Sequence, residues 1–329
     1  MSSEWLEVRA YAMRHRHELS AVAASSYPGA LRVAGTPLLS TPAWLPSRPV
    51  DLRAVELRRT DRPFEGVVPP EPRYSAVLKE LAPPAVFENR PTHRLRGAEL
   101  ASGTPWLSFS DGSYFDGADV GELAAHELAA SLLAKDAGTR IREQVGDPCD
   151  LTRRPANMAI SVLTLRLSAG GEASFPLHWR DPAKVGHAGG LYMVVPVGVF
   201  QEPGFSLWDS MVREFAEELL GAAEGDTDYA ALPFARALDD GTARAYCLGL
   251  GVDPLTFATD LMVAVVIEAQ QYDEWFGAMV DTNEEGRLIR RVDFTAAEIE
   301  RYTEHEPMQA AGAAQLRLAW QVREHLISR

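Results

Sequence analysis

Residues 158–167 constrain the fold more than any other part of the chain, because an alternating pattern places apolar residues on both sides. One set of alternate positions includes Met158, Ile160 and Val162, and the other includes Leu163 and Leu165. A strand that is apolar on both sides is covered by packed layers on both sides. We therefore predict a strand that is buried on much of both faces.

The segments around this strand predict a mixed sheet whose strands are interleaved with helices. Gly170 and Gly171 turn the chain back into a hairpin. Strand-like segments are found at 172–179, 191–200, 243–249 and 261–269, and helical periodicity is found at 206–220, 271–280, 296–302 and 308–327. We predict that residues 151–329 form one α/β domain.

Residues 1–150 are predicted to form an N-terminal helical and extended segment that packs on this domain. Helical spacing covers 4–24, and the stretch 28–91 is rich in proline and arginine, which predicts extended segments with one helix at 74–81. Asp119 and Glu122 form a capping-box pattern in front of a helix at 120–135. The basic run Arg14-His15-Arg16-His17 is predicted to lie on a solvated face of the first helix.

Charge and composition exclude several classes of protein. The chain has 329 residues, of which 46% are hydrophobic and 24% are charged, a globular mixture. Its net charge of −14 has the wrong sign for a surface that binds a nucleic-acid duplex. No apolar stretch has the length that spans a bilayer, and residues 1–16 are too polar for a secretion signal. We expect a cytoplasmic protein that binds neither nucleic acid nor membrane, and a homodimer stays open.

Residues 206–221 predict one helix with three carboxylates at the border of its apolar face. Glu214 and Glu218 are four residues apart, a like-charge spacing that costs a helix roughly a few tenths of a kcal/mol. Together with Glu217 they form a set of oxygen ligands suited to Mg²⁺ or Mn²⁺, which in proteins often also contacts substrate phosphates. The alternative is a solvated acidic face on which Arg213 and Glu217 form an ordinary ion pair.

The sequence Arg213-Glu214-Phe215-Ala216-Glu217-Glu218 resembles the core of the Nudix box, and 189–200 resembles the glycine and strand that precede this box. The resemblance covers about residues 158–329 and implies a Nudix-like α/β/α sandwich with a mixed sheet. It also implies that Glu214, Glu217 and Glu218 are metal ligands or the general base, with Arg213 beside them in a catalytic site. Residues 195–204 and 246–255 are further similar to Nudix-like domains of actinobacterial regulator-type proteins.

Two positions depart from the pattern of the family. Phe205 stands where the family has an isolated glutamate, and Leu220 stands where it has a glycine.

The loop between the second and third predicted strands carries Lys184 and His187, and Arg180 precedes it. Cations and an imidazole in this loop suit a phosphate group, so these three residues are predicted to bind substrate. The alternative is that they are merely solvated.

Two functions stay open. The first is a hydrolase that cleaves a diphosphate linkage, in a nucleoside diphosphate derivative or a related metabolite, with water activated on Mg²⁺ or Mn²⁺. The second is a Nudix-like domain that has lost hydrolysis and binds a ligand as a sensor or scaffold, acting with a partner protein. The residues favour the hydrolase, because a like-charge triad that binds no cation has no evident reason to be present.

Overall fold

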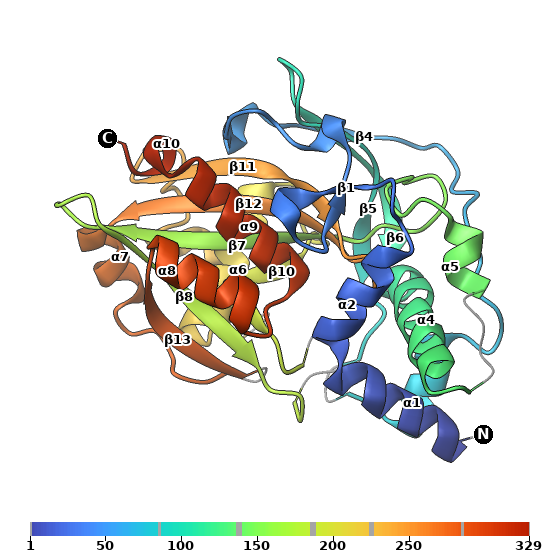
Figure 1. Cartoon of the computed structure of the whole chain (residues 1–329). Coiled ribbons are helices and arrows are strands. Elements are labelled where there is room, and N and C mark those ends of the chain that lie inside the picture. Colours follow the sequence, from blue (N-terminus) through green and yellow to red (C-terminus); the bar gives the residue numbers. More distant parts are fainter. Residues whose placement is uncertain are drawn as a thin grey trace.

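A mixed β-sheet with helices on both faces lies in the middle of the molecule (Figure 1). The computed structural model describes residues 2–84, 87–135, 140–184, 189–223, 227–283 and 286–328. Within these ranges the strands of the sheet are β1 (Leu31–Arg32), β2 (Leu39–Ser40), β3 (Val50–Asp51), β7 (Met158–Leu167), β8 (Ala173–Arg180), β9 (Tyr192–Val194), β10 (Val197–Val199), β11 (Ala243–Val252), β12 (Thr259–Glu268) and β13 (Gly286–Asp293).

The centre of this sheet is the parallel pair β7 and β12. Met158 lies beside Thr259, and the register continues without a shift to Leu167 beside Glu268. The order across the sheet is β1-β2-β11-β12-β7-β8-β13, while β3 pairs with β11, β10 with β7 and β9 with β8. These other pairings are antiparallel, so the predicted mixed sheet is confirmed.

The helices are α1 (Ser2–Arg14), α2 (Arg16–Ser25), α3 (Tyr74–Leu81), α4 (Tyr114–Leu132), α5 (Arg140–Val145), α6 (Leu207–Glu214), α7 (Ala269–Phe276), α8 (Ala296–Glu300), α9 (Ala310–Gln321) and α10 (Arg323–Ile327). Short 3₁₀ segments are η1 (Val33–Gly35), η2 (Pro42–Trp44), η3 (Leu52–Ala54) and η5 (Tyr229–Ala231), and π-helical segments are η4 (Phe215–Leu219) and η6 (Arg301–His305). Among the described residues, none of these helices is both long enough and apolar enough to cross a lipid bilayer.

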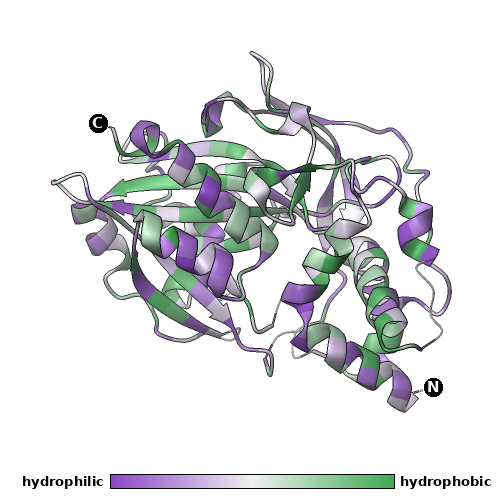
Figure 2. Ribbon diagram, viewed as in Figure 1, coloured by the Kyte–Doolittle hydropathy of each residue, from purple (hydrophilic) through white to green (hydrophobic). Residues whose placement is uncertain are grey.

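The two sides of β7 pack into two different hydrophobic clusters. Ile160 and Val162 belong to the cluster that contains α6 and α7, whereas Leu163 and Leu165 belong to the cluster under α9. Figure 2 shows hydrophobic residues along the central strands and hydrophilic residues on outward helical surfaces. The predicted α/β/α sandwich is therefore confirmed.

A smaller sheet belongs to the first half of the chain. It contains β4 (Glu56–Arg59), β6 (Trp106–Ser113) and β5 (Pro91–Glu99), in the order β4-β6-β5. Leu107 and Phe109 of β6 lie in the same hydrophobic cluster as Ile160 of β7. The two halves thus share a core, and the division into 1–150 and 151–329 stays a prediction.

Several predicted elements have different bounds. The opening helix is divided into α1 and α2 at His15, and Arg16 is not solvated, because it is buried in an ion pair with Glu122 at 2.8 Å. The helix predicted from 120 begins earlier, at Tyr114, where Asp116 accepts a hydrogen bond from Ser113 N at 2.8 Å. Asp119 does not cap this helix, since its carboxylate accepts a hydrogen bond from Ser75 N of α3.

The strand predicted at 191–200 is two short strands. Pro196 cannot donate to a ladder, and it separates β9, which pairs with β8, from β10, which pairs with β7. The helix at 308–327 is likewise divided into α9 and α10. β5 and β13 were not predicted, because their arginine-rich sequences lack a continuous apolar pattern.

Candidate functional site

The box helix, which comprises α6 and η4, carries the predicted catalytic residues. Ser206 caps its start by accepting a hydrogen bond from Asp209 N at 3.2 Å, and Gly221, with φ of 68°, follows its end. Met211 and Phe215 on its apolar side are buried in the cluster beneath the sheet. The predicted helix is confirmed, although its last turn is π-helical.

Glu214 lies against β10, and 15% of its side chain is exposed. Arg213 Nη2 donates a hydrogen bond to Glu214 Oε1 at 2.8 Å and another to Val199 O at 3.4 Å. A Cβ at Gly198 would overlap the Glu214 carboxyl group, so glycine makes this close approach to β10 possible. Burial raises the pKa of Glu214 to about 8, even though Arg213 acts in the opposite direction.

Glu218 is held by a different set of partners. Val197 N donates a hydrogen bond to Glu218 Oε1 at 2.8 Å, and His178 Nδ1 of β8 lies 3.6 Å from Glu218 Oε2. The backbone carbonyl of Glu218 accepts a hydrogen bond from Asn283 Nδ2 at 3.5 Å. This carboxylate is therefore hydrogen-bonded to the backbone of β10 and lies beside a buried histidine.

Glu217 faces another part of the chain. Tyr229 of η5 donates its hydroxyl hydrogen to Glu217 Oε1 at an oxygen–oxygen distance of 2.5 Å. Across the described residues, no three His, Cys, Asp or Glu side chains are close enough together to hold a metal ion. The structure thus gives Glu214, Glu217 and Glu218 separate protein partners, and their roles as metal ligands stay predictions.

Phe205 is part of an aromatic cluster that joins the two halves of the chain. Its ring centroid lies 5.0 Å from His93 and 5.7 Å from both Phe109 and Phe200. The guanidinium of Arg59 lies 4.2 Å from the Phe205 ring centroid. The position of the family's isolated glutamate is therefore used for packing against the smaller sheet.

The predicted substrate-binding residues are placed only in part near the box helix. Lys184 donates a hydrogen bond to Asn283 O at 3.1 Å, and Asn283 in turn contacts Glu218. Arg180 lies at the end of β8, where its backbone pairs with Leu191 and Gly190. His187 falls outside the described residues. Their contact with a substrate stays a prediction.

His178 is a residue of this site that sequence reasoning missed. It is 1% exposed on β8 and lies beside Glu218. The sequence contains one signal for it, a single imidazole within the otherwise apolar stretch 175–179. A buried histidine needs a polar partner, but its sequence position does not say which carboxylate that partner is.

Two solved structures are similar to about half of this chain. No model of a protein family matches the chain, and no curated protein matches it. Among solved structures, a Nudix hydrolase from M. smegmatis, RenU, is similar over 52% of this chain and 88% of its own, with 17% identity and a TM-score of 0.30. A MutT/nudix family protein from Enterococcus faecalis is similar over 52% of this chain and 62% of its own, with 11% identity and a TM-score of 0.32. At these TM-scores, neither likeness carries an argument about activity.

Proposed function

We propose that this chain is a Nudix-like protein that binds a small metabolite and does not hydrolyse a diphosphate. The observation that carries this proposal is the separate engagement of the three box carboxylates. Arg213 binds Glu214, the backbone of Val197 binds Glu218, and Tyr229 binds Glu217. These contacts give the three glutamates a structural role that needs no cation. The absence of such a role was the reason for which the sequence alone favoured a hydrolase.

The three glutamates have the right type of ligand atom for a divalent cation, but their side chains are not arranged around a common site. Carboxylate oxygens are suitable ligands for Mg²⁺ or Mn²⁺. However, a shared ion would have to replace the Tyr229 and Val197 hydrogen bonds and compete with the hydrogen bond from Arg213 to Glu214.

One departure from the Nudix box and one further resemblance support the same function. Phe205 packs between the two halves of the chain, where a carboxylate would be desolvated among aromatic rings. The resemblance of 195–204 and 246–255 to regulator-type proteins also favours a sensor over an enzyme. A sensor of this kind transmits ligand binding to a partner protein.

A metal-dependent hydrolase is the second candidate, and one observation favours it. Glu214 and Glu218 approach the adjacent residues Gly198 and Val197 of β10, and the charge of Glu218 contributes to the raised pKa of Glu214. Movement of the Arg213 side chain away from Glu214 would free that carboxylate. In this case the substrate would be a diphosphate of the class that the resemblance implies.

Phosphorus NMR distinguishes the two candidates. Wild type, Glu217→Gln and Glu218→Gln are incubated with a panel of nucleoside diphosphate derivatives and either Mg²⁺ or Mn²⁺. We expect no product from wild type above the level of a protein-free control. Product that requires the metal and disappears in both variants would contradict our proposal and establish the hydrolase.

A further inference from the structure

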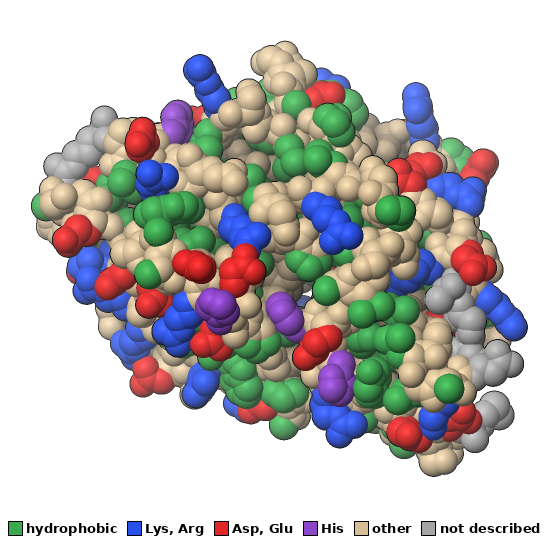
Figure 3. All heavy atoms as spheres, in the orientation of Figure 1, with side chains coloured by type: hydrophobic (Ala, Val, Ile, Leu, Met, Phe, Trp, Pro, Cys, Tyr) green, Lys and Arg blue, Asp and Glu red, His purple; other side chains and the backbone are tan. Residues whose placement is uncertain are grey.

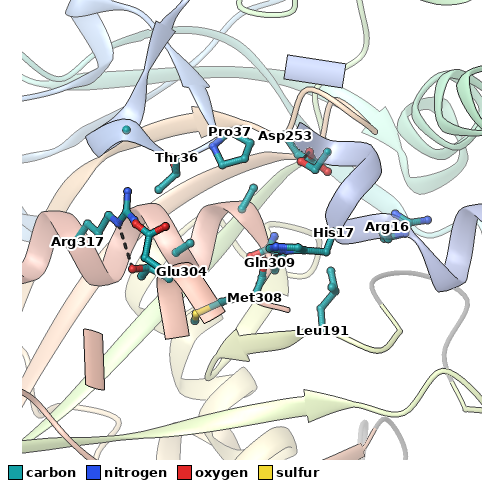
Figure 4. A pocket seen from close by; sticks show the side chains of 15 residues that line it. Arg16, His17, Thr36, Pro37, Leu191, Asp253, Glu304, Met308, Gln309 and Arg317 are labelled. Carbon is teal, nitrogen blue, oxygen red and sulfur yellow. Dashed lines mark hydrogen bonds and ion pairs between the residues drawn. The ribbon is translucent and has the colours of Figure 1, made fainter. Parts of the chain in front are cut away.

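A cavity of about 180 Å³ lies between the first and last parts of the chain (Figure 4). Figure 3 shows the molecular surface hollowed on this side, with histidine and acidic side chains around the hollow. The cavity is lined by α2, the residues after η1, and the first turns of α9. His17 joins its two sides by donating from Nδ1 to Met308 O at 3.2 Å. The cavity lies on the α9 face of the sheet, opposite the box helix.

One face of α9 lines the cavity along its long side. Ala310, Ala313 and Arg317 follow helical spacing on one side, and the two alanines leave room in front of the helix. Gln309 and Arg317 are eight residues apart, which corresponds to about 12 Å along the axis. Helical side chains lean toward the N-terminus, so the guanidinium of Arg317 shortens this separation. Figure 4 places Arg317 at one end of the cavity and Gln309 and Asp253 toward the other.

The Arg317 end suits an acid group. Arg317 donates from Nε to Thr303 Oγ1 at 3.2 Å and from Nη1 to Ala34 O at 3.1 Å, and it forms an ion pair with Glu304. A guanidinium has five N–H donors, so these contacts leave donors for a carboxylate or phosphate. Glu304 is 52% exposed, and an incoming acid can displace it into solvent.

The opposite end suits a cationic nitrogen. Asp253 lines the cavity and accepts hydrogen bonds from Ser20 Oγ at 2.8 Å and Thr256 Oγ1 at 3.0 Å. Asp260 is 1% exposed, and Ser161 Oγ donates to its Oδ1 at 2.7 Å. Within the described residues, Asp260 Oδ2 has no hydrogen-bond partner. Burial raises the pKa of Asp260 to about 6, and because Asp260 does not itself line the cavity, it acts on this end only through Gln309 and Asp253.

We propose that this cavity binds a small zwitterionic molecule, with its cationic nitrogen beside Gln309 and Asp253 and its acid group at Arg317. This inference rests on the proposed ligand-binding function and assigns it a site and a ligand class. A cavity of roughly 150 Å³ accommodates benzene, so the present cavity suits a molecule of about six to ten non-hydrogen atoms. Arg16 also lines the cavity, but its charge is balanced by the ion pair with Glu122 at 2.8 Å. Asp253 and Arg317 therefore favour a ligand whose amine and acid lie at opposite ends.

Isothermal titration calorimetry tests this proposal on the full chain in buffer that contains a chelator and no divalent metal. The probes are 5-aminovalerate, which has both charges, pentylamine, which has the cation alone, and valerate, which has the anion alone. We expect 5-aminovalerate to bind at least tenfold more tightly than either half. Equal affinities for the three probes, or no heat with 5-aminovalerate, would overturn the proposal.

Variants locate the two ends of the ligand. Arg317→Gln should weaken 5-aminovalerate at least tenfold and leave pentylamine unchanged, whereas Asp253→Asn should weaken pentylamine and leave valerate unchanged. Glu304→Gln should strengthen 5-aminovalerate several-fold, because Glu304 competes for Arg317. Arg287→Gln, an exposed arginine outside the cavity lining, is the matched control. An unchanged affinity in Glu304→Gln, a variant at a half-exposed position, would overturn the assignment even where Arg317→Gln fails to fold.

The outcome is separable from that of the proposed function. Turnover of a diphosphate with Mg²⁺ would contradict the non-hydrolytic function, while zwitterion binding in chelator would still support this cavity. Absence of turnover together with absence of zwitterion binding would overturn only the present inference.

Discussion

Replacing Glu214 with glutamine should change how the stability of the protein depends on pH. Burial raises the pKa of Glu214 from an ordinary 4.5 to about 8. Because the folded protein holds the proton more tightly than the unfolded chain, this group stabilises the fold fully below pH 4.5, and the stabilisation is lost as pH rises toward 8. Linkage at about 1.4 kcal/mol per pH unit gives a loss of roughly 3 kcal/mol between pH 5 and pH 8. Glutamine is isosteric with the protonated acid, so Glu214→Gln should lack this loss.

Urea unfolding at a series of pH values between 5 and 8 measures the effect, with the free energy of unfolding obtained by linear extrapolation. We expect similar stability for wild type and Glu214→Gln at pH 5, and a variant that is more stable by about 3 kcal/mol at pH 8. Asp209→Asn removes an exposed carboxylate from the same helix and controls for the loss of one negative charge. Parallel pH profiles for wild type and Glu214→Gln would show that Glu214 is ionised in the fold, and would refute the reasoning from burial.

Three further substitutions test contacts described above. Gly198→Ala should destabilise the protein by about 1–3 kcal/mol in urea unfolding, because the added Cβ displaces the Glu214 carboxyl group; an unchanged midpoint would contradict this close approach. Tyr229→Phe should cost about 1 kcal/mol in the same assay, since it removes the hydrogen bond to Glu217; equal stability would mean that this bond is absent in solution. Arg154→Met should cost about 3 kcal/mol and lower the melting temperature, because Arg154 is fully buried and donates to Pro148 O, Phe257 O and Thr259 Oγ1; a tolerated substitution would show that these acceptors find other donors.

The layered fold could be predicted from the sequence because its central elements have strong periodicity. The strand at 158–167 and the helix at 74–81 were predicted with the bounds that the structure has. β5 and β13 could not be found in this way, because each is an edge strand interrupted by arginines and depends on tertiary pairing. The start of α4 was not predicted correctly because two capping patterns lie close together, Ser113 with Asp116 and Asp119 with Glu122. The contact of Asp119 with α3 leaves the first pattern to start the helix.

The candidate site could be predicted less completely than the fold. Helical spacing places Glu214, Glu217 and Glu218 on one short segment, but it contains no information about what faces them. The donors that separate these carboxylates come from Val197 on β10 and Tyr229 in η5, which pattern reasoning cannot place against the helix. Pairing across distant segments depends on the packing of the whole chain, and residue types alone leave it undetermined.

The hydrogen bond between His17 and Met308 spans 291 positions of sequence, and it has a consequence for the biogenesis of the protein. One wall of the cavity is synthesised well before the other, because the two walls are far apart in the sequence. Contacts of such separation form late, because the chain must first pay the entropy of closing a long loop. During synthesis, α2 therefore cannot make its contacts with α9 until α9 has left the ribosome. A ribosome-bound chain that ends before Met308 lacks this wall, so the proposed ligand would bind only after α9 has been synthesised.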